Sequence, residues 1–287
     1  MCEDDIDAGP VDLTYSRYAR GLMSVAGGGA GGAGGAAGVV ETEVDVKTPD
    51  GVANAVLLHP AGAGKWPAVL IWTDIFGLRP VYRDMGRRLA AQGYVVLIPN
   101  PFYRSGRNPM GDKPLDFANP EDRAKLMALR GAMTNPGIDS DAKAYIGFLD
   151  AQPQTDSGVK AGVQGYCMGG ALSVRTAAAV PERIGAAASF HGGTLAREPA
   201  DPESPHNLLS RVKAEIYHAI ADNDDKAQPE GKDIFEAARK AAKVAGETVV
   251  YEGSDHGWCI EGSRVYNEPG AERAWTALSA LYKRALA

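Results

Sequence analysis

A cysteine framed by glycines is the residue of this chain best placed to do chemistry. Cys167 lies in the stretch Gln-Gly-Tyr-Cys-Met-Gly-Gly, residues 164–170, after a mostly apolar run over residues 159–163 and before a helical pattern of small residues from Ala171. A side chain exposed on a sharp strand-to-helix turn forces strained backbone angles, so its neighbours must lack bulk. Free N–H groups at the start of the next helix favour a thiolate or an oxyanion. This order predicts a nucleophile elbow with cysteine in place of the usual serine.

Acid and base candidates follow this cysteine along the chain. Asp222, Asp224 and Asp225 come directly after one expected strand, and His256 comes shortly after the next. The carboxyl ends of parallel strands meet at one edge of a sheet, so these side chains are expected to lie together. His256 would take the proton of the Cys167 thiol and later activate water, while an aspartate would orient the imidazole. The spacing alone leaves all three aspartates open.

Alternating strands and helices are expected to position these residues. Extended runs cover residues 44–46, 53–58, 68–72, 94–98, 159–163, 184–190, 214–220 and 248–251. Helical patterns cover residues 84–92, 121–133, 139–151, 231–245 and 271–286. The first two extended runs flank a Pro-Asp-Gly turn at residues 49–51, which predicts a hairpin. The alternation that follows predicts an α/β fold with a mostly parallel central sheet and helices on both faces, in one domain over residues 40–287.

The bulk composition excludes several classes of protein. The chain has 287 residues, of which 45% are hydrophobic, enough for a substantial core. A net charge of -6 gives no electrostatic footprint for nucleic acid or an anionic membrane. No apolar run approaches the roughly 18 residues that a membrane span needs. The cysteines Cys2, Cys167 and Cys259 are too sparse for a disulfide framework and lack metal-ligand spacing, so no metal is expected.

The first 39 residues are expected to form a flexible leader, because a Gly/Ala-rich segment buries too little surface to order itself. Arg17 and Arg20 precede a weakly apolar stretch, a pattern that faintly resembles a twin-arginine export signal, although the two arginines are not adjacent. We therefore expect a cytoplasmic protein, with a periplasmic location as the alternative. The glycines over residues 27–38 follow no strand, which argues against a dinucleotide-binding loop. We expect either a monomer or a homodimer.

From about Val40 to its C-terminus the chain resembles the dienelactone hydrolase family of α/β-hydrolases. The matching motifs are Asp-Ile-Phe-Gly-Leu at residues 74–78, Pro-Asn-Pro-Phe-Tyr-Arg at 99–104, Gly-Tyr-Cys-Met-Gly-Gly at 165–170, Asp-Asn-Asp at 222–224 with Pro-Glu at 229–230, and His-Gly-Trp at 256–258. The resemblance implies an α/β-hydrolase fold. It also implies a hydrolase of ester or lactone bonds in small molecules that needs no cofactor and uses Cys, Asp and His.

The resemblance also assigns roles within the site. The family pattern has its catalytic acid about five residues before a Pro-Glu pair, which selects Asp224 and leaves Asp225 as the fallback. Two backbone N–H groups are expected to form the oxyanion hole. One belongs to Met168, the residue after the nucleophile, and by resemblance the other belongs to Ile75.

Two positions depart from the family pattern. Asp74 stands where the family usually has a glutamate that contacts the resting thiol. Because aspartate is one methylene shorter, we expect this contact to be lost or remade. Arg104 matches an arginine that binds a substrate carboxylate, but Ile260 replaces the second arginine of that clamp. A less charged ester is therefore at least as good a candidate substrate as a dienelactone.

Three further residues are candidates for the surroundings of the site. Tyr103 and Trp258 are expected either to line an apolar pocket or to belong to the core. His191 is expected to form pocket wall or to support the site. Two other functions stay open. One is thioester or phosphoester hydrolysis by the same triad, and the other is a redox-sensing or ligand-binding protein with a low-pKa thiol.

Overall fold

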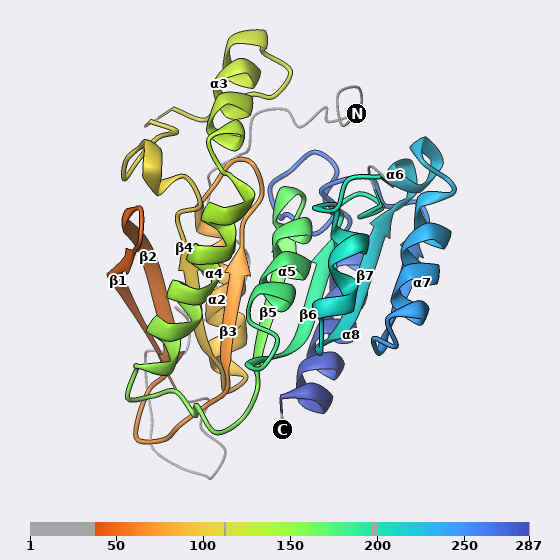
Figure 1. The fold of residues 1–287 in the computed structure, drawn as a ribbon. Helices are drawn as coiled ribbons and strands as arrows, with labels where there is room; N and C mark the ends of the chain where they lie inside the picture. The colour runs from red at the N-terminus through yellow and green to blue at the C-terminus, as the bar shows by residue number, and fades with distance from the viewer. Residues whose placement is uncertain (1–37, 112, 197–199, 287) are drawn as a thin grey trace.

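The computed structural model describes residues 38–111, 113–196 and 200–286, so nearly all of the expected leader lies outside the described residues. One eight-stranded sheet runs through the molecule in the order β1-β2-β4-β3-β5-β6-β7-β8 (Figure 1). Its strands are β1 (Val39–Thr48), β2 (Gly51–Pro60), β3 (Ala68–Trp72), β4 (Val95–Pro99), β5 (Ala161–Tyr166), β6 (Ile184–Phe190), β7 (Glu215–Ala221) and β8 (Gly246–Tyr251).

Helices cover both faces of this sheet. They are α2 (Pro80–Ala91), α3 (Pro120–Gly131), α4 (Asn135–Asp150), α5 (Met168–Ala179), α6 (Asp222–Ala227), α7 (Gly231–Ala241) and α8 (Glu268–Ala285), with short 3₁₀ turns η1 (Tyr103–Ser105) and η2 (Pro205–Arg211). In Figure 1, α4, α5 and α7 lie in front of the sheet, and α2 and α8 lie behind it. Each layer buries its own apolar core, one containing Leu172 and Phe235 and the other Tyr82 and Leu278.

The predicted α/β architecture is confirmed. β1 and β2 form the expected antiparallel hairpin, and β2 pairs antiparallel with β4. All remaining pairs are parallel. The strands β3 and β4 are buried along their whole length because helices cover them on both sides, which accounts for their unbroken apolar sequences.

The register of the sheet aligns the ends of its neighbouring strands. Tyr166 at the end of β5 pairs with Phe190 at the end of β6, and Phe190 pairs with Ala219 of β7. Ala221 at the end of β7 pairs with Tyr251 at the end of β8. The loops that follow these four strands therefore start from one edge of the sheet.

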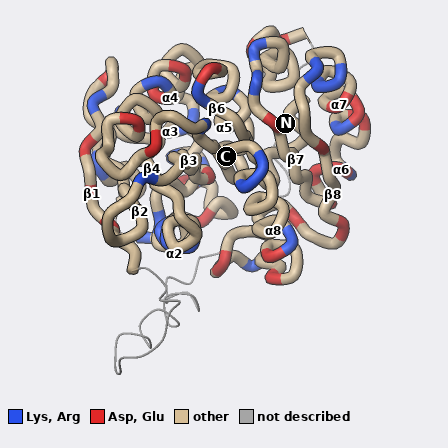
Figure 2. Tube along the Cα trace, turned by 90° about the horizontal axis from the view of Figure 1, so that it is seen from below, with Lys and Arg blue, Asp and Glu red and all other residues tan. Residues whose placement is uncertain are grey.

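Some elements differ from the predictions. The helix expected over residues 231–245 ends at Ala241, because Lys243 adopts a left-handed φ of 57° that turns the chain toward β8. The short helix α6 was not expected. Figure 2 shows Lys and Arg interspersed with Asp and Glu along the chain, in keeping with the modest net charge. No helix in the described part of the chain is both long and apolar enough to cross a membrane.

Candidate active site

Cys167 lies on a strained turn between β5 and α5. Its φ of 53° and ψ of -119° fall in a region of backbone angles that residues other than glycine rarely adopt. A Cβ atom at Gly165 would overlap the Gly169 carbonyl, and one at Gly169 would overlap the Trp72 carbonyl. Both glycines are therefore required for the strand, the turn and the helix to approach this closely. The thiol itself stays partly exposed at the start of α5.

His256 and Asp224 meet at the same edge of the sheet. Asp224 follows β7, His256 follows β8, and Nδ1 of the imidazole lies 2.8 Å from Oδ2 of the carboxylate. A carboxylate only accepts hydrogen bonds, so Nδ1 carries the proton. The Asn223 side chain fixes the pair, because its Oδ1 accepts the N–H of His256 at 2.8 Å and that of Asp224 at 3.0 Å. Sequence reasoning missed Asn223, although it lies inside the Asp-Asn-Asp motif.

The two other aspartates of this segment are engaged elsewhere. Asp222 pairs with Lys226 at 2.9 Å and accepts the N–H of Gly253 at 3.1 Å. Asp225 pairs with Lys232 at 2.8 Å. Of the three acid candidates, the structure brings Asp224 to the imidazole.

The second ring nitrogen of His256, Nε2, is not bonded to Asp224. Nε2 is buried and makes no hydrogen bond of ordinary geometry to any described residue. Burial disfavours the imidazolium, yet the pKa of His256 is raised well above its usual value because the Cys167 sulfur and the bond to Asp224 favour the charged ring. The site therefore favours the protonated imidazole, the form that can give a proton to a leaving group.

The two expected oxyanion donors are both available. Met168 is the first residue of α5, where backbone N–H groups have no partner within the helix. The N–H of Ile75 lies in the loop between β3 and α2. Neither N–H has an acceptor among the residues that the structure describes.

His191 lies directly beneath the nucleophile. Its side chain is fully buried, and its Nδ1 accepts the N–H of Cys167 at 3.1 Å. Its ring packs edge-on against those of His256 and Trp258, with 5.2 Å between centroids in each case. Burial, together with the nearby His256, lowers the pKa of His191 well below its usual value, so this ring stays neutral. Trp258 is fully buried and stacks on Tyr251, which makes it a core residue.

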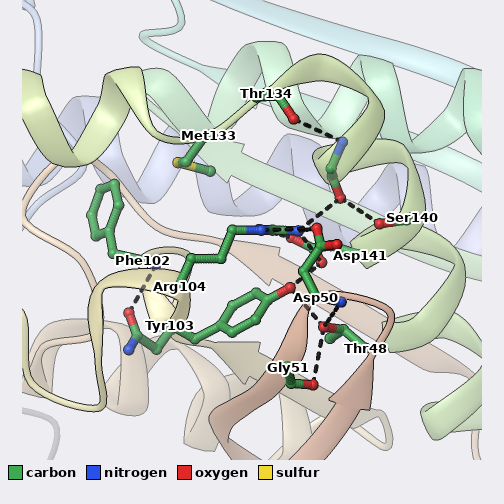
Figure 3. Close-up of polar contacts among 12 residues, drawn as sticks. Thr48, Asp50, Gly51, Phe102, Tyr103, Arg104, Met133, Thr134, Ser140 and Asp141 are labelled. Atoms are coloured by element: carbon green, nitrogen blue, oxygen red, sulfur yellow. Dashed lines mark hydrogen bonds and ion pairs between the residues drawn. The ribbon is translucent and has the colours of Figure 1, made fainter.

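Tyr103 and Arg104 belong to a different polar network (Figure 3). The Arg104 guanidinium binds Asp141 at 2.7 Å and Asp50 at 2.6 Å. The buried Tyr103 hydroxyl donates to Asp141 at 2.7 Å and contacts Thr48. This network ties the β1–β2 hairpin to α4. Two aspartates already neutralise Arg104, which argues against its expected role in binding a substrate carboxylate.

The Asp74 carboxylate pairs with Arg79. It accepts a charged hydrogen bond from Arg79 through Oδ2 and the N–H of Phe76 through Oδ1 at 3.0 Å. The carboxylate of Asp74 is thus engaged within the loop that carries Ile75 and not by the thiol.

Two hollows lie near these residues. A cleft of about 290 Å³ borders the loop after Ile75 and is lined in part by Phe76, Leu78, Met110 and Leu115. A larger cavity of about 470 Å³ lies between α2 and α8. Neither hollow is lined by Cys167, Asp224 or His256. Within the described residues, no group of three or more His, Cys, Asp or Glu side chains is arranged to hold a metal ion.

Comparison with known proteins places the chain in a family. The model of the dienelactone hydrolase family matches residues 53–286. A relative from Synechocystis carries the name carboxymethylenebutenolidase. It is 26% identical to this chain over 231 residues, which cover 80% of this chain and 91% of that protein. One of the same name in Escherichia coli K12 is 24% identical over 223 residues, covering 77% of this chain and 78% of that protein.

Solved structures share the fold. A dienelactone hydrolase from Klebsiella pneumoniae superposes with a TM-score of 0.74 at 22% identity, covering 86% of this chain and 99% of that one. The dienelactone hydrolase-like promiscuous phosphotriesterase P91, from metagenomic libraries, superposes with a TM-score of 0.69 at 21% identity, covering 87% of this chain and 100% of that one. The resemblance seen in the sequence is thereby confirmed: the chain belongs to the dienelactone hydrolase family and is a hydrolase of ester bonds.

Proposed function

We propose that the chain hydrolyses carboxylic esters or lactones of small molecules through an acyl-thioester on Cys167. The observation that carries this proposal is the 2.8 Å bond between His256 and Asp224 at a site where Cys167 also raises the pKa of His256. A nucleophile next to a base that a third group orients is the arrangement that covalent acyl transfer requires.

In the first half-reaction, the Cys167 thiolate attacks the carbonyl carbon and forms a carbon–sulfur bond. The carbonyl oxygen becomes an oxyanion, which the N–H groups of Met168 and Ile75 stabilise. The oxyanion then collapses, the bond to the alcohol oxygen breaks, and the His256 imidazolium gives its proton to the leaving alkoxide. For a lactone, the alcohol stays attached to the acyl group.

In the second half-reaction, neutral His256 removes a proton from water as the water attacks the thioester carbonyl. The same two N–H groups stabilise the second oxyanion. Collapse releases the carboxylic acid and returns the Cys167 thiolate beside the imidazolium. Asp224 stabilises the charged ring in both halves without changing its own protonation.

The surroundings favour an acyl or alcohol group without a carboxylate. Ile260 is 3% exposed and apolar, and Arg104 is occupied by Asp50 and Asp141. Neither residue offers a free cation to a dianionic substrate.

The substrates tested should include phosphotriesters, because a structural relative carries the name of a promiscuous phosphotriesterase. The panel should also contain acyl-thioesters and lactones, compared by kcat/KM.

Replacing Cys167 by alanine tests the proposal. The variant is expected to lose hydrolysis of p-nitrophenyl acetate, since it lacks the thiolate that attacks the carbonyl. Cys259→Ala is the matched control: burial raises the pKa of Cys259 well above its usual value, so this thiol stays protonated. Full activity in Cys167→Ala would refute the proposal, and so would an equal loss in both variants.

A further inference from the structure

A single aspartate organises the loop between β3 and α2. Asp74 is 6% exposed, and its backbone N–H donates to the Tyr82 hydroxyl at 2.9 Å. Its carbonyl accepts the N–H of Gly77 at 3.0 Å, and its Oδ1 accepts that of Phe76, also at 3.0 Å. The N–H groups on both sides of Ile75 are therefore committed to fixed acceptors.

The N–H of Ile75 is the exception in this turn. Of the N–H groups of residues 74–77, all described by the structure, it alone has no acceptor. The peptide planes before and after it are held by bonds to Asp74, so its direction is set before any substrate arrives. Preorganised donors of this kind need no rearrangement when charge develops on a substrate oxygen.

Arg79 compensates the negative charge of the buried Asp74 carboxylate. Its guanidinium donates to Asp74 Oδ2 and lies over the rings of Phe76, at 5.1 Å, and Tyr82, at 5.6 Å. Burial disfavours the cation, but the charge of Asp74 raises the pKa of Arg79 above its usual value. A buried carboxylate that lost this partner would be strongly destabilised.

The same loop is fitted to the helix that carries the other donor. A Cβ atom on Gly169 would overlap the carbonyls of Trp72 and Thr73, so the start of the loop lies against the first turn of α5. The N–H groups of Ile75 and Met168 are thus held in one packed unit.

We infer that Asp74 and Arg79 are positioning residues of the oxyanion hole, which hold the Ile75 N–H toward the reacting carbonyl, and that Asp74 does not serve as a contact of the resting thiol. Both carboxylate oxygens of Asp74 are engaged within the loop. The inference rests on the proposed function, because an oxyanion hole matters only where Cys167 attacks a carbonyl.

Two readouts separate these roles. Hydrolysis of p-nitrophenyl acetate needs the oxyanion hole, whereas alkylation of Cys167 by iodoacetamide needs only the thiolate. Asp74→Ala is expected to lower kcat on the order of 100-fold, the effect of losing one oxyanion donor. KM and the alkylation rate should stay within about threefold of wild type, because this interaction forms only in the transition state.

Matched variants complete the test. Asp74→Asn keeps an oxygen for the Phe76 N–H and is expected to recover kcat to within about tenfold of wild type. Arg79→Gln should lower kcat by at least about tenfold, again without slowing alkylation. Asp84→Asn breaks a comparable pair with Arg87 on α2 and should match wild type in both assays.

An unchanged kcat in Asp74→Ala would overturn the inference, and so would an alkylation rate that falls together with kcat, as a thiol contact predicts. If Asp74→Ala does not fold by circular dichroism, the same criteria apply to Arg79→Gln, where a wild-type kcat overturns the inference. Cys167→Ala tests the proposed function separately. If it abolishes hydrolysis while Asp74→Ala and Arg79→Gln remain fully active, only the inference fails.

Discussion

Removing the Asp224 carboxylate should lower kcat/KM, and the size of the loss follows from the hydrogen bond between this carboxylate and the His256 imidazole. The carboxylate accepts a charge-assisted hydrogen bond from His256 at 2.8 Å. Such a bond contributes about 1.5–3 kcal/mol. If all of it is lost in the transition state, where the ring is charged, Asp224→Ala lowers kcat/KM by about 10- to 150-fold.

Asp225→Ala is the control for this prediction. Asp225 lies one residue away on α6 and pairs with Lys232, so removing it costs a partly buried ion pair and leaves His256 untouched. We expect kcat/KM for p-nitrophenyl acetate to stay within about twofold of wild type in this variant.

Thermal unfolding should accompany both assays, so that a loss of activity is not a loss of fold. The reasoning would be refuted if Asp225→Ala lost as much activity as Asp224→Ala, or if Asp224→Ala kept wild-type kcat/KM. Either result would mean that a different carboxylate supports the imidazole.

His191→Asn and His191→Phe separate hydrogen bonding from packing under the nucleophile: Asn can accept the Cys167 N–H and tolerates the φ of 40°, whereas Phe only fills the space. The Cys167 N–H also donates to Phe190 O, so His191→Phe is expected to lower kcat only about two- to tenfold, the effect of roughly one hydrogen bond. His191→Asn is expected to keep a kcat near that of wild type, and equal losses in the two variants would contradict this. Acid should destabilise the fold through His218, whose burial lowers its pKa to about 4. Its stabilising contribution is full above the unfolded pKa of about 6.5 and lost as pH falls toward 4, by about 3 kcal/mol. Urea unfolding from pH 7 to 4 should therefore show a shallower fall for His218→Gln than for wild type, and parallel curves would exclude His218 as the cause.

The choice among the three aspartates shows where sequence reasoning stops. Asp222, Asp224 and Asp225 lie within one short helix, and their side chains point to three different partners. Spacing cannot separate them, because one helical turn spreads neighbouring residues around its axis. The family pattern supplied the selection of Asp224 that the residues alone could not.

The strands were readable because of their surroundings. The runs that became β3 and β4 are apolar at every position, as burial on both faces requires. The glycines at positions 165 and 169 also carried a readable signal, since only close approach of backbone explains them.

Long-range pairs were not readable in this way. Arg104 was expected to face a substrate, yet its partners are Asp50 and Asp141, 54 and 37 residues away in the chain. Nothing in the local sequence of an arginine indicates which carboxylate will meet it after folding. The bond from Cys167 to His191 was missed for the same reason, because it joins the ends of two strands.

Direct detection of an acyl group on Cys167 would test the proposed thioester intermediate best. We would mix the protein with p-nitrophenyl trimethylacetate, whose bulky acyl group slows deacylation, quench in acid and map the peptides by mass spectrometry. We expect a trimethylacetyl thioester on Cys167 that neutral hydroxylamine removes, and none in Cys167→Ala. A stable acyl group on a serine, or continued turnover in Cys167→Ala, would contradict it.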